Sequence, residues 1–241
     1  MSNNFRVVTV CNRIPQEPYY TLREFEKSLG DAPLTVLGTK KGEYLGLASK
    51  PKLLLDAIYK GLISEEYVIF CDCWDLVFTC HPEELFECYQ AFSAPIVVSS
   101  ERNCFPADLR EQYDALPFTS SFRYLNSGMI VAETQALQIA LESMELHNVP
   151  DDHFDPDLGR MVHPNDQFLW QQTFLKQPVR IELDYNQILC NTLHDVKIED
   201  LDFSKGRIRL KETGVYPCSY HLNGGAKTGG LREPILNHLG L

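Results

Sequence analysis

The chain has 241 residues, and its 44% hydrophobic and 23% charged residues are ordinary for a globular protein. This length allows one large α/β domain or two small ones. Its 22 Lys and Arg against 33 Asp and Glu give a formal net charge of −11. That balance disfavours non-specific binding to a nucleic-acid backbone, because such binding needs clustered cations, so a nucleic-acid partner is not expected.

The apolar runs of the chain are too short to span a bilayer. The longest, such as Tyr67–Cys71 and Met129–Ala132, have the length of a strand. The first residues, MSNNFRVVTVCN, contain one early Arg and a strand-length apolar run, which is not the pattern of a signal peptide. We therefore expect a cytoplasmic protein without a membrane partner.

The chain contains eight cysteines. Five of them lie in or beside apolar, strand-like segments: Cys11, Cys71, Cys73, Cys104 and Cys190. Without a secretion signal, this placement favours free buried thiols over disulfides. The Cys-x-Cys pair within the third apolar segment could indicate zinc, but no second pair stands at finger-like spacing, so a structural zinc site is disfavoured.

The first half of the chain alternates strand-like and helix-like segments. Strands are predicted at Arg6–Cys11, Leu34–Leu37, Tyr67–Phe70 and Ile96–Ser99, and helices at Tyr20–Leu29, Pro51–Leu62 and Pro82–Ala91. This order predicts an α/β fold with a parallel sheet and helices on both faces.

The second half is less regular. Strand-like patterns occur at Met129–Ala132, Arg180–Leu183 and Arg207–Leu210, and helical ones at Thr134–Met144, with Thr134 as the expected N-cap, and at Asp166–Phe174. His147–Met161 is polar and rich in Pro and Asp, which predicts a long surface loop. No linker, internal repeat or low-complexity tract divides the chain, so we expect a single domain over residues 1–241.

Acidic residues follow two of the predicted strands. Asp72 and Asp75 come after the third strand, and Glu101 follows the fourth. In open α/β sheets, ligands bind at the carboxyl ends of the strands. Paired carboxylates there are good ligands for Mg²⁺ or Mn²⁺, but the spacing equally allows Asp75 to cap a turn.

Six ordered blocks carry a family resemblance: FCDCWDLVF, VVSSERNCFP, RYLNSGMIVA, NDQFLW, LDYNQILCN and HLNGGAK. Together they resemble the glycosyltransferase domain of collagen lysyl hydroxylases and the related procollagen galactosyltransferases, over nearly the whole chain. The resemblance implies a GT-A fold, that is, a Rossmann-like, mixed but mainly parallel sheet flanked by helices on both faces. It further implies a UDP-sugar donor and a Mn²⁺ ion.

Carried onto this sequence, the resemblance assigns three metal ligands. Asp72 and Asp75 are its metal-binding aspartates, and His221 in HLNGGAK is its third ligand. An imidazole ligand suits Mn²⁺ better than Mg²⁺. Without the resemblance, the histidine would be an ordinary polar loop residue.

The resemblance also assigns residues to the nucleotide. The uridine would be bordered by backbone atoms of Thr9, Val10 and Cys11, and Trp74 would stack on uracil. The residues expected near the nucleotide and its phosphates are Asp72, Lys50, Asn223, Gly224 and Lys227. Each assignment has a plainer alternative. The tryptophan could be core packing, the first lysine a surface residue, and the glycine-rich block an untethered tail.

Two residues are assigned to the sugar. Asp166 is expected as a catalytic or sugar-binding carboxylate, with a helix N-cap as the alternative. Asn126 would hydrogen-bond sugar hydroxyls, although its YLNSG block could also be a turn that satisfies its own backbone. The chain departs from the family in having Asn165 where an acidic residue is usual and Phe105 where Trp is usual.

The expected function is a metal-dependent transfer of a hexose from UDP-glucose or UDP-galactose to a hydroxyl. The acceptor suggested by the resemblance is hydroxylysine or galactosyl-hydroxylysine in a collagen-like chain, and a different, even nucleobase, acceptor stays open. The alternative is a catalytically inactive nucleotide-sugar-binding or structural member of the fold. A metal-dependent nucleotidyltransferase or phosphohydrolase is disfavoured by the His221 block and YLNSG.

Overall fold

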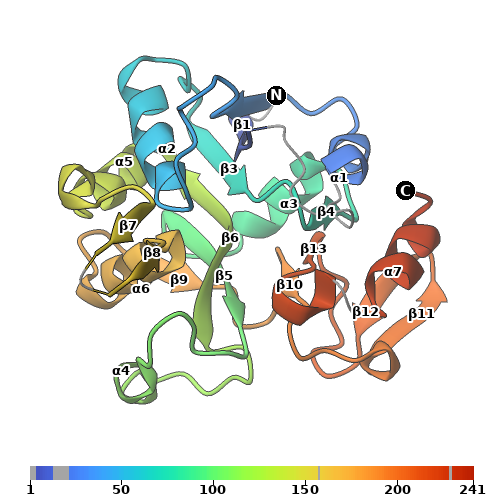
Figure 1. The fold of residues 1–241 in the computed structure, drawn as a ribbon. Helices are drawn as coiled ribbons and strands as arrows, with labels where there is room; N and C mark the ends of the chain where they lie inside the picture. The colour runs from blue at the N-terminus through green and yellow to red at the C-terminus, as the bar shows by residue number, and fades with distance from the viewer. Residues whose placement is uncertain (1–3, 13–21, 157, 228–229) are drawn as a thin grey trace.

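A six-stranded sheet forms the centre of the molecule (Figure 1). The computed structural model describes residues 4–12, 22–156, 158–227 and 230–241. The strand order is β2-β1-β3-β6-β5-β9, with bounds β1 Phe5–Val10, β2 Leu34–Leu37, β3 Tyr67–Cys71, β5 Ile96–Glu101, β6 Tyr124–Glu133 and β9 Ile181–Leu183. All neighbours are parallel except β6, which runs antiparallel to both β3 and β5.

Helices cover both faces of this sheet because its strands are apolar on both sides. In β1, Val8 and Val10 face one core cluster while Phe5 and Val7 face the other. On the first face lie α2 (Ser49–Tyr59), α5 (Thr134–Glu142) and α6 (Asp166–Lys176). On the second face lie α1 (Leu22–Ser28) and α3 (Pro82–Tyr89).

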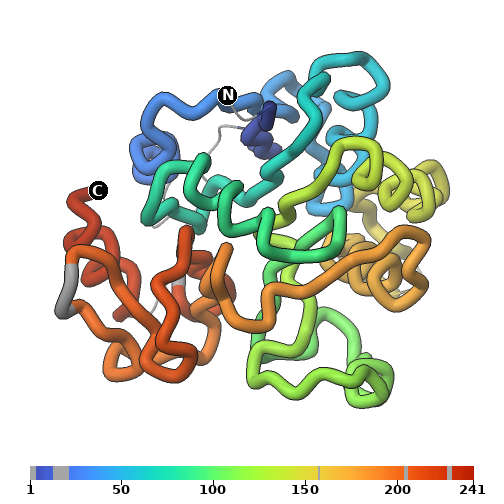
Figure 2. The backbone as a smooth tube through the Cα atoms, turned by 180° about the vertical axis from the view of Figure 1, so that it is seen from behind, coloured from blue at the N-terminus to red at the C-terminus, as the bar shows by residue number. Residues whose placement is uncertain are grey.

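The last fifty residues form a smaller layer beside the main sheet (Figure 2). Its elements are β10 (Asn191–Thr192), the 3₁₀ turn Ile198–Asp200, β11 (Leu201–Lys205), β12 (Arg207–Leu210), β13 (Ser219–His221), the 3₁₀ turn Gly224–Lys227 and α7 (Arg232–Leu239). A three-stranded sheet, β10-β13-β4, joins this layer to β4 (Leu76–Phe78), which follows β3 directly. A third core cluster, including Tyr220 and Ile235, lies beneath it.

The predicted α/β fold with helices on both faces is confirmed, with corrections in detail. YLNSG is not a turn: β6 already begins at Tyr124, after an excursion that contains α4 (Arg110–Asp114) and reverses the chain. The reversal explains why the sheet is mixed rather than wholly parallel. The predicted surface loop contains a 3₁₀ turn (Leu146–Asn148) and a hairpin of β7 (His153–Asp155) with β8 (Arg160–Val162).

Thr134 is the first residue of α5, and the N-cap is Glu133. The hydroxyl of Thr134 donates to the carbonyl oxygen of Glu65 at 2.6 Å, so it joins the helix to a preceding loop. All eight cysteines are free thiols, as predicted. Among the described residues, the structure has no helix with the length and apolarity needed to cross a membrane.

Candidate active site

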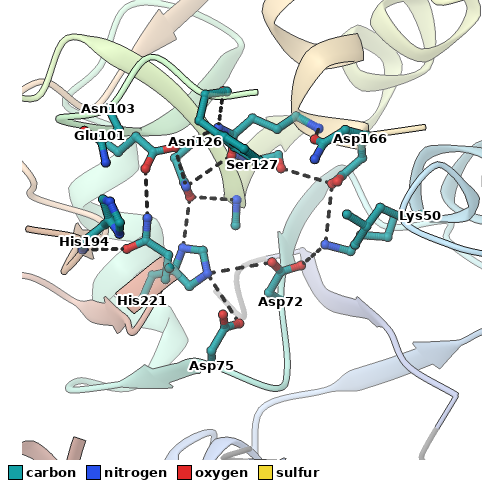
Figure 3. Close-up of a pocket in the computed structure, with 17 residues that line it drawn as sticks. Lys50, Asp72, Asp75, Glu101, Asn103, Asn126, Ser127, Asp166, His194 and His221 are labelled. Atoms are coloured by element: carbon teal, nitrogen blue, oxygen red, sulfur yellow. Dashed lines mark hydrogen bonds and ion pairs between the residues drawn. The ribbon is translucent and has the colours of Figure 1, made fainter. Parts of the chain in front are cut away.

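A pocket of about 330 Å³ opens where β3 and β5 end, beside the first half of β6 (Figure 3). It is lined by Leu47, Lys50, Asp72, Asp75, Glu101, Asn103, Phe105, Asn126, Ser127, Gly128, Asn165, Asp166, Gln167, His194, His221, Asn223 and Gly224. Residues from the six-stranded sheet and from the three-stranded sheet therefore line one cavity. It lies at the strand ends where the sequence predicted a site.

Two carboxylates and an imidazole converge on one wall. The ligand atoms of Asp72, Asp75 and His221 all lie within 4.8 Å of one another. His221 Nε2 is 3.4 Å from Asp75 Oδ1 and 3.8 Å from Asp72 Oδ2. The pairing of β4 with β13 produces this meeting, because Leu76, next to Asp75, stands opposite His221 in the register.

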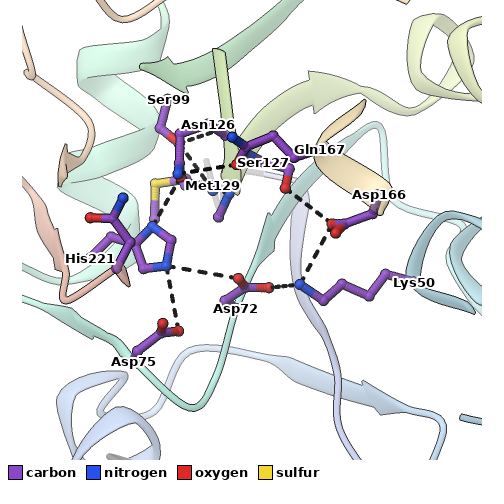
Figure 4. A network of polar contacts seen from close by, with 12 residues as sticks. Lys50, Asp72, Asp75, Ser99, Asn126, Ser127, Met129, Asp166, Gln167 and His221 are labelled. Carbon is purple, nitrogen blue, oxygen red and sulfur yellow. Dashed lines mark hydrogen bonds and ion pairs between the residues drawn. The ribbon is translucent and has the colours of Figure 1, made fainter. Parts of the chain in front are cut away.

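The hydrogen bonds of His221 indicate which ring nitrogen carries the proton (Figure 4). Its Nδ1 lies 3.0 Å from Asn126 Oδ1, and the Asn126 amide is oriented by donation from its Nδ2 to Glu101 Oε1 at 3.1 Å. A carbonyl oxygen only accepts, so Nδ1 is the donor. Nε2 then faces the two carboxylates, and a set of two carboxylates and one imidazole nitrogen fits a divalent cation.

Gly128 allows the imidazole to reach this position. A Cβ atom built on Gly128 would lie 2.1 Å from Cε1 and 2.3 Å from Nδ1 of His221. Any side chain at this point of β6 would therefore displace the ring.

Lys50 and Asp166 form the opposite wall. Lys50 Nζ is 2.6 Å from Asp72 Oδ1 and 3.5 Å from Asp166 Oδ2. Burial by itself would lower the pKa of Lys50, but the carboxylates of Asp166 and Asp72 outweigh it and raise the pKa well above its ordinary value. Lys50 therefore stays charged and is no surface lysine, since it is only 8% exposed.

Asp166 is not the N-cap of α6. Asn165 takes that place, and its side chain accepts from the backbone N–H of Gln167 at 2.9 Å. The carboxylate of Asp166 is consequently left for the pocket, where it accepts from the hydroxyl of Ser127 at 3.0 Å. Asn165, one of the two residues at which this chain departs from the family pattern, thus serves as the helix cap.

Three amide groups converge on Glu101. Its Oε1 accepts from Asn126 Nδ2 at 3.1 Å and from Gln167 Nε2 at 2.7 Å, and its Oε2 accepts from Asn223 Nδ2 at 2.9 Å. Burial raises the pKa of Glu101, and the amide donors oppose that rise. One buried carboxylate therefore orients side chains from β6, α6 and the segment after β13.

His194 joins the pocket to the glycine-rich turn. Asn223 Oδ1 accepts from the backbone N–H groups of Leu193 and His194, both at 3.0 Å. His194 Nδ1 in turn accepts from the N–H of Gly225 at 3.2 Å, and a Cβ on Gly224 would meet that nitrogen at 2.1 Å. Sequence reasoning missed His194. Its signal is weak: the histidine lies two residues after a short strand that pairs with the strand ending at His221.

The remaining nucleotide predictions fall elsewhere. Thr9, Val10 and Cys11 lie buried at the carboxyl end of β1, and none of them lines the pocket. Trp74 also does not line it; this half-buried residue packs against the core cluster on the α1 and α3 side, and its stacking on uracil stays a prediction. The side chain of Lys227 lies outside the described residues, so its predicted role stays a prediction.

The family is established by the sequence model of the PLOD GT domain, which matches residues 3–240. The chain belongs to this family, a glycosyltransferase-like domain, as predicted. It is 30% identical over 184 residues to an uncharacterised protein, R699, of Acanthamoeba polyphaga mimivirus, covering 75% of this chain and 35% of that protein. It is 28% identical over 216 residues to the procollagen-lysine,2-oxoglutarate 5-dioxygenase of Drosophila melanogaster, covering 82% of this chain and 28% of that protein. The chain thus spans about a third or less of the length of these relatives.

Solved structures of glycosyltransferases share the fold. A glycosyltransferase involved in the glycosylation of the major capsid of PBCV-1 superposes with a TM-score of 0.53 at 14% identity, covering 98% of this chain and 99% of that one. Mouse xyloside xylosyltransferase 1 gives a TM-score of 0.51 at 13% identity, covering 93% of this chain and 98% of that one. The predicted GT-A fold is therefore confirmed.

Proposed function

We propose that this chain is a metal-dependent glycosyltransferase that moves glucose or galactose from a UDP-sugar to an acceptor hydroxyl. One observation carries the proposal: Asp72, Asp75 and His221 meet at the carboxyl end of β3 with acceptor atoms facing one another. The family and the fold support a transferase. A galactosyltransferase with this fold, LgtC, was solved with donor and acceptor sugar analogues (TM-score 0.50, 10% identity, 98% and 95% covered), which supports the choice of a sugar nucleotide.

Asp72, Asp75 and His221 would hold the metal ion, for which we propose Mn²⁺. The ion would stabilise the negative charge that develops on the departing diphosphate. Lys50 binds Asp72 through Oδ1, which leaves Oδ2 on the side of His221, so the lysine orients this ligand. Asn126 contacts His221 and therefore orients the ligand set, so we assign it as a positioning residue. It also lines the pocket, so its hydrogen bond to the sugar stays part of the proposal.

Asp166 is the carboxylate that we assign to the transferred sugar or to the acceptor proton. Its oxygen is held by Ser127 and Lys50 from two elements, so its direction into the pocket is fixed. Gly224, which lines the pocket, would let backbone atoms approach the diphosphate, and His194 accepts from the next N–H, that of Gly225. For the acceptor we propose a hydroxyl on a collagen-like chain, because relatives of this chain are named for procollagen lysine.

Thermal shift with a donor panel tests the proposal. UDP-glucose, UDP-galactose, UDP-GlcNAc and GDP-mannose are added to the full chain with and without Mn²⁺. A ligand that binds the folded state raises its stability, so UDP-glucose or UDP-galactose should raise the melting temperature only with Mn²⁺. A shift with GDP-mannose alone would refute the donor assignment.

Turnover separates the transferase from an inactive binder. UDP release is measured with a hydroxylysine-containing collagen-like peptide, with and without the peptide's hydroxyl. Asp75→Asn should abolish release, whereas Asp56→Asn, an exposed aspartate paired with Lys60, should leave it unchanged. Mn²⁺-dependent UDP binding without any turnover would instead favour the inactive member of the fold.

A further inference from the structure

Three thiols and a carboxylate gather behind the candidate active site, where none of the roles above uses them. Cys80 lies in the turn before α3, Glu84 and Cys88 lie on α3, and Cys218 directly precedes β13. The three positions 80, 84 and 88 follow one another at intervals of four, which places the two on α3 along one side of that helix. Cys218 lies beside Cys88 in the fold, although 130 positions separate the two in the sequence.

Three of these groups have the spacing of metal ligands, and Cys88 adjoins them through the sulfur of Cys218. The ligand atoms of Cys80, Glu84 and Cys218 all lie within 4.8 Å of one another. The sulfurs of Cys218 and Cys88 are 3.8 Å apart. Two thiolates on one tetrahedral Zn²⁺, with Zn–S bonds of about 2.3 Å, stand about 3.8 Å apart.

The surroundings hold the four groups in place and admit an ion. Arg207 donates to the carbonyl oxygens of Tyr216 and Pro217 at 3.2 and 3.0 Å, and its Nη1 is 2.5 Å from Glu84 Oε1. The guanidinium thus fixes the segment before Cys218 and offsets negative charge at the cluster. Cys218 is buried, Glu84 is exposed, and the other two thiols are half-buried, so the cluster reaches the surface on one side.

We propose that Cys80, Cys88 and Cys218, with Glu84, form a second metal site that takes a thiophilic divalent ion such as Zn²⁺. Binding displaces one proton from each thiol, and the carboxylate completes four ligands. The site lies at one end of the β4–β13 pair, while Asp75 and His221 lie at the other end of the same pair. The ion would therefore fix the two strands that carry these active-site residues, without taking part in the chemistry there.

Cobalt(II) titration of the metal-free, reduced full chain tests this proposal. Co²⁺ bound by thiolates gives a sulfur-to-cobalt charge-transfer band that carboxylate and imidazole ligands do not give, so the two metal sites are distinguished within one spectrum. We expect the band to saturate at one equivalent and to disappear when Zn²⁺ is added.

Matched variants identify which thiols bind the Co²⁺ that gives this charge-transfer band. Cys218→Ser and the less buried Cys88→Ser should abolish or strongly reduce it, while Cys104→Ser, a half-buried thiol outside the cluster, should retain it. Asp75→Asn should also retain it, so failure of the active-site proposal would not imitate failure of this one. The proposal is overturned if the wild-type chain gives no such band, if Cys88→Ser and Cys218→Ser both keep it, or if mass spectrometry of the non-reduced protein finds Cys218 in a disulfide.

Discussion

At the scale of single residues, the orientation of the Asn126 amide sets the orientation of the His221 imidazole. Asn126 Nδ2 donates to Glu101, and Asn126 Oδ1 accepts from His221 Nδ1 and from the N–H of Gly128, the last at 3.0 Å. His221 is thereby held with Nε2 toward Asp72 and Asp75. Groups that orient a metal-binding histidine in this way typically change metal affinity when they are removed.

Asn126→Ala is therefore expected to weaken Mn²⁺ binding by roughly 10- to 100-fold. Titration calorimetry of the full chain measures this independently of turnover. Asn148→Ala serves as the control, because it removes an exposed amide that donates to Glu145 far from the metal ligands. Equal Mn²⁺ affinity of Asn126→Ala and the wild type would show that Asn126 does not position His221.

Gly128→Ala tests the close approach of the same ring from the backbone side. Its added Cβ would lie 2.3 Å from Nδ1, too close for two non-bonded atoms, so His221 must move and Mn²⁺ affinity should fall at least as far as in Asn126→Ala. Gly206→Ala, where an added Cβ meets nothing within 4 Å, is the matched control. An unchanged affinity in Gly128→Ala would mean that His221 is not needed where the structure places it.

At the scale of elements, a buried carboxylate organises the connection from β9 to β10. Asp184 directly follows β9 and accepts from the backbone N–H groups of Ile188, Leu189 and Cys190 at 2.8, 2.7 and 3.1 Å. Desolvation by burial nevertheless outweighs these donors and raises the pKa of Asp184 from 3.8 to about 6. The turn that leads into the second sheet is therefore sensitive to pH.

The sign of this pH dependence follows from linkage. Between pH 4 and 6 the folded chain keeps the Asp184 proton that the unfolded chain has lost, so the contribution of this group to stability is present below pH 4 and falls as pH rises through 6. The difference is on the order of 3 kcal/mol. Urea unfolding at several pH values should show the Asp184→Asn variant losing less stability than the wild type over this interval. A parallel pH dependence of the two proteins would contradict the raised pKa.

At the scale of the whole molecule, the proposed metal ion would join two sheets. Asp72 follows β3 of the six-stranded sheet, whereas His221 ends β13 of the three-stranded sheet. Unfolding of either layer separates these ligands. Binding energy at this site therefore adds to the stability of the entire chain.

Mn²⁺ at one hundred times its dissociation constant should raise the free energy of unfolding by about 2.7 kcal/mol. Chemical denaturation with and without Mn²⁺ measures the increase, and excess chelator should reverse it. Asp75→Asn should show little or no increase, because it loses one ligand charge, whereas Asp56→Asn should respond like the wild type. An equal increase in Asp75→Asn would place the stabilising ion somewhere else on the protein.

Much of the architecture follows from local patterns. Continuous apolar runs predicted β1, β3 and β5, and helical spacing predicted α2, α3, α5 and α6 within a few residues. The position of Asp72 and Glu101 at the site follows from the same patterns, because acidic residues at strand ends lie where such sheets bind ligands. The antiparallel direction of β6 did not follow, because direction depends on how the chain returns from the excursion that contains α4.

The sequence by itself determined the α/β class, the family and the position of Asp72 and Asp75 after the third strand. It could do so because periodicity, strand ends and ordered motifs are local properties of the chain. Only the tertiary structure decided which partner each group has. In the structure, Asn165 caps the helix and Asp166 lines the pocket, while the half-buried Trp74 packs against a core cluster. His194 lies in the pocket lining, and the thiol of Cys218 lies beside Cys80 and Glu84. The physical reason is that hydrogen bonds and metal ligands act over about 3 Å, whereas the partners lie tens of positions apart in sequence. His194 and Cys218, for example, reach their neighbours through the pairing of β4, β10 and β13.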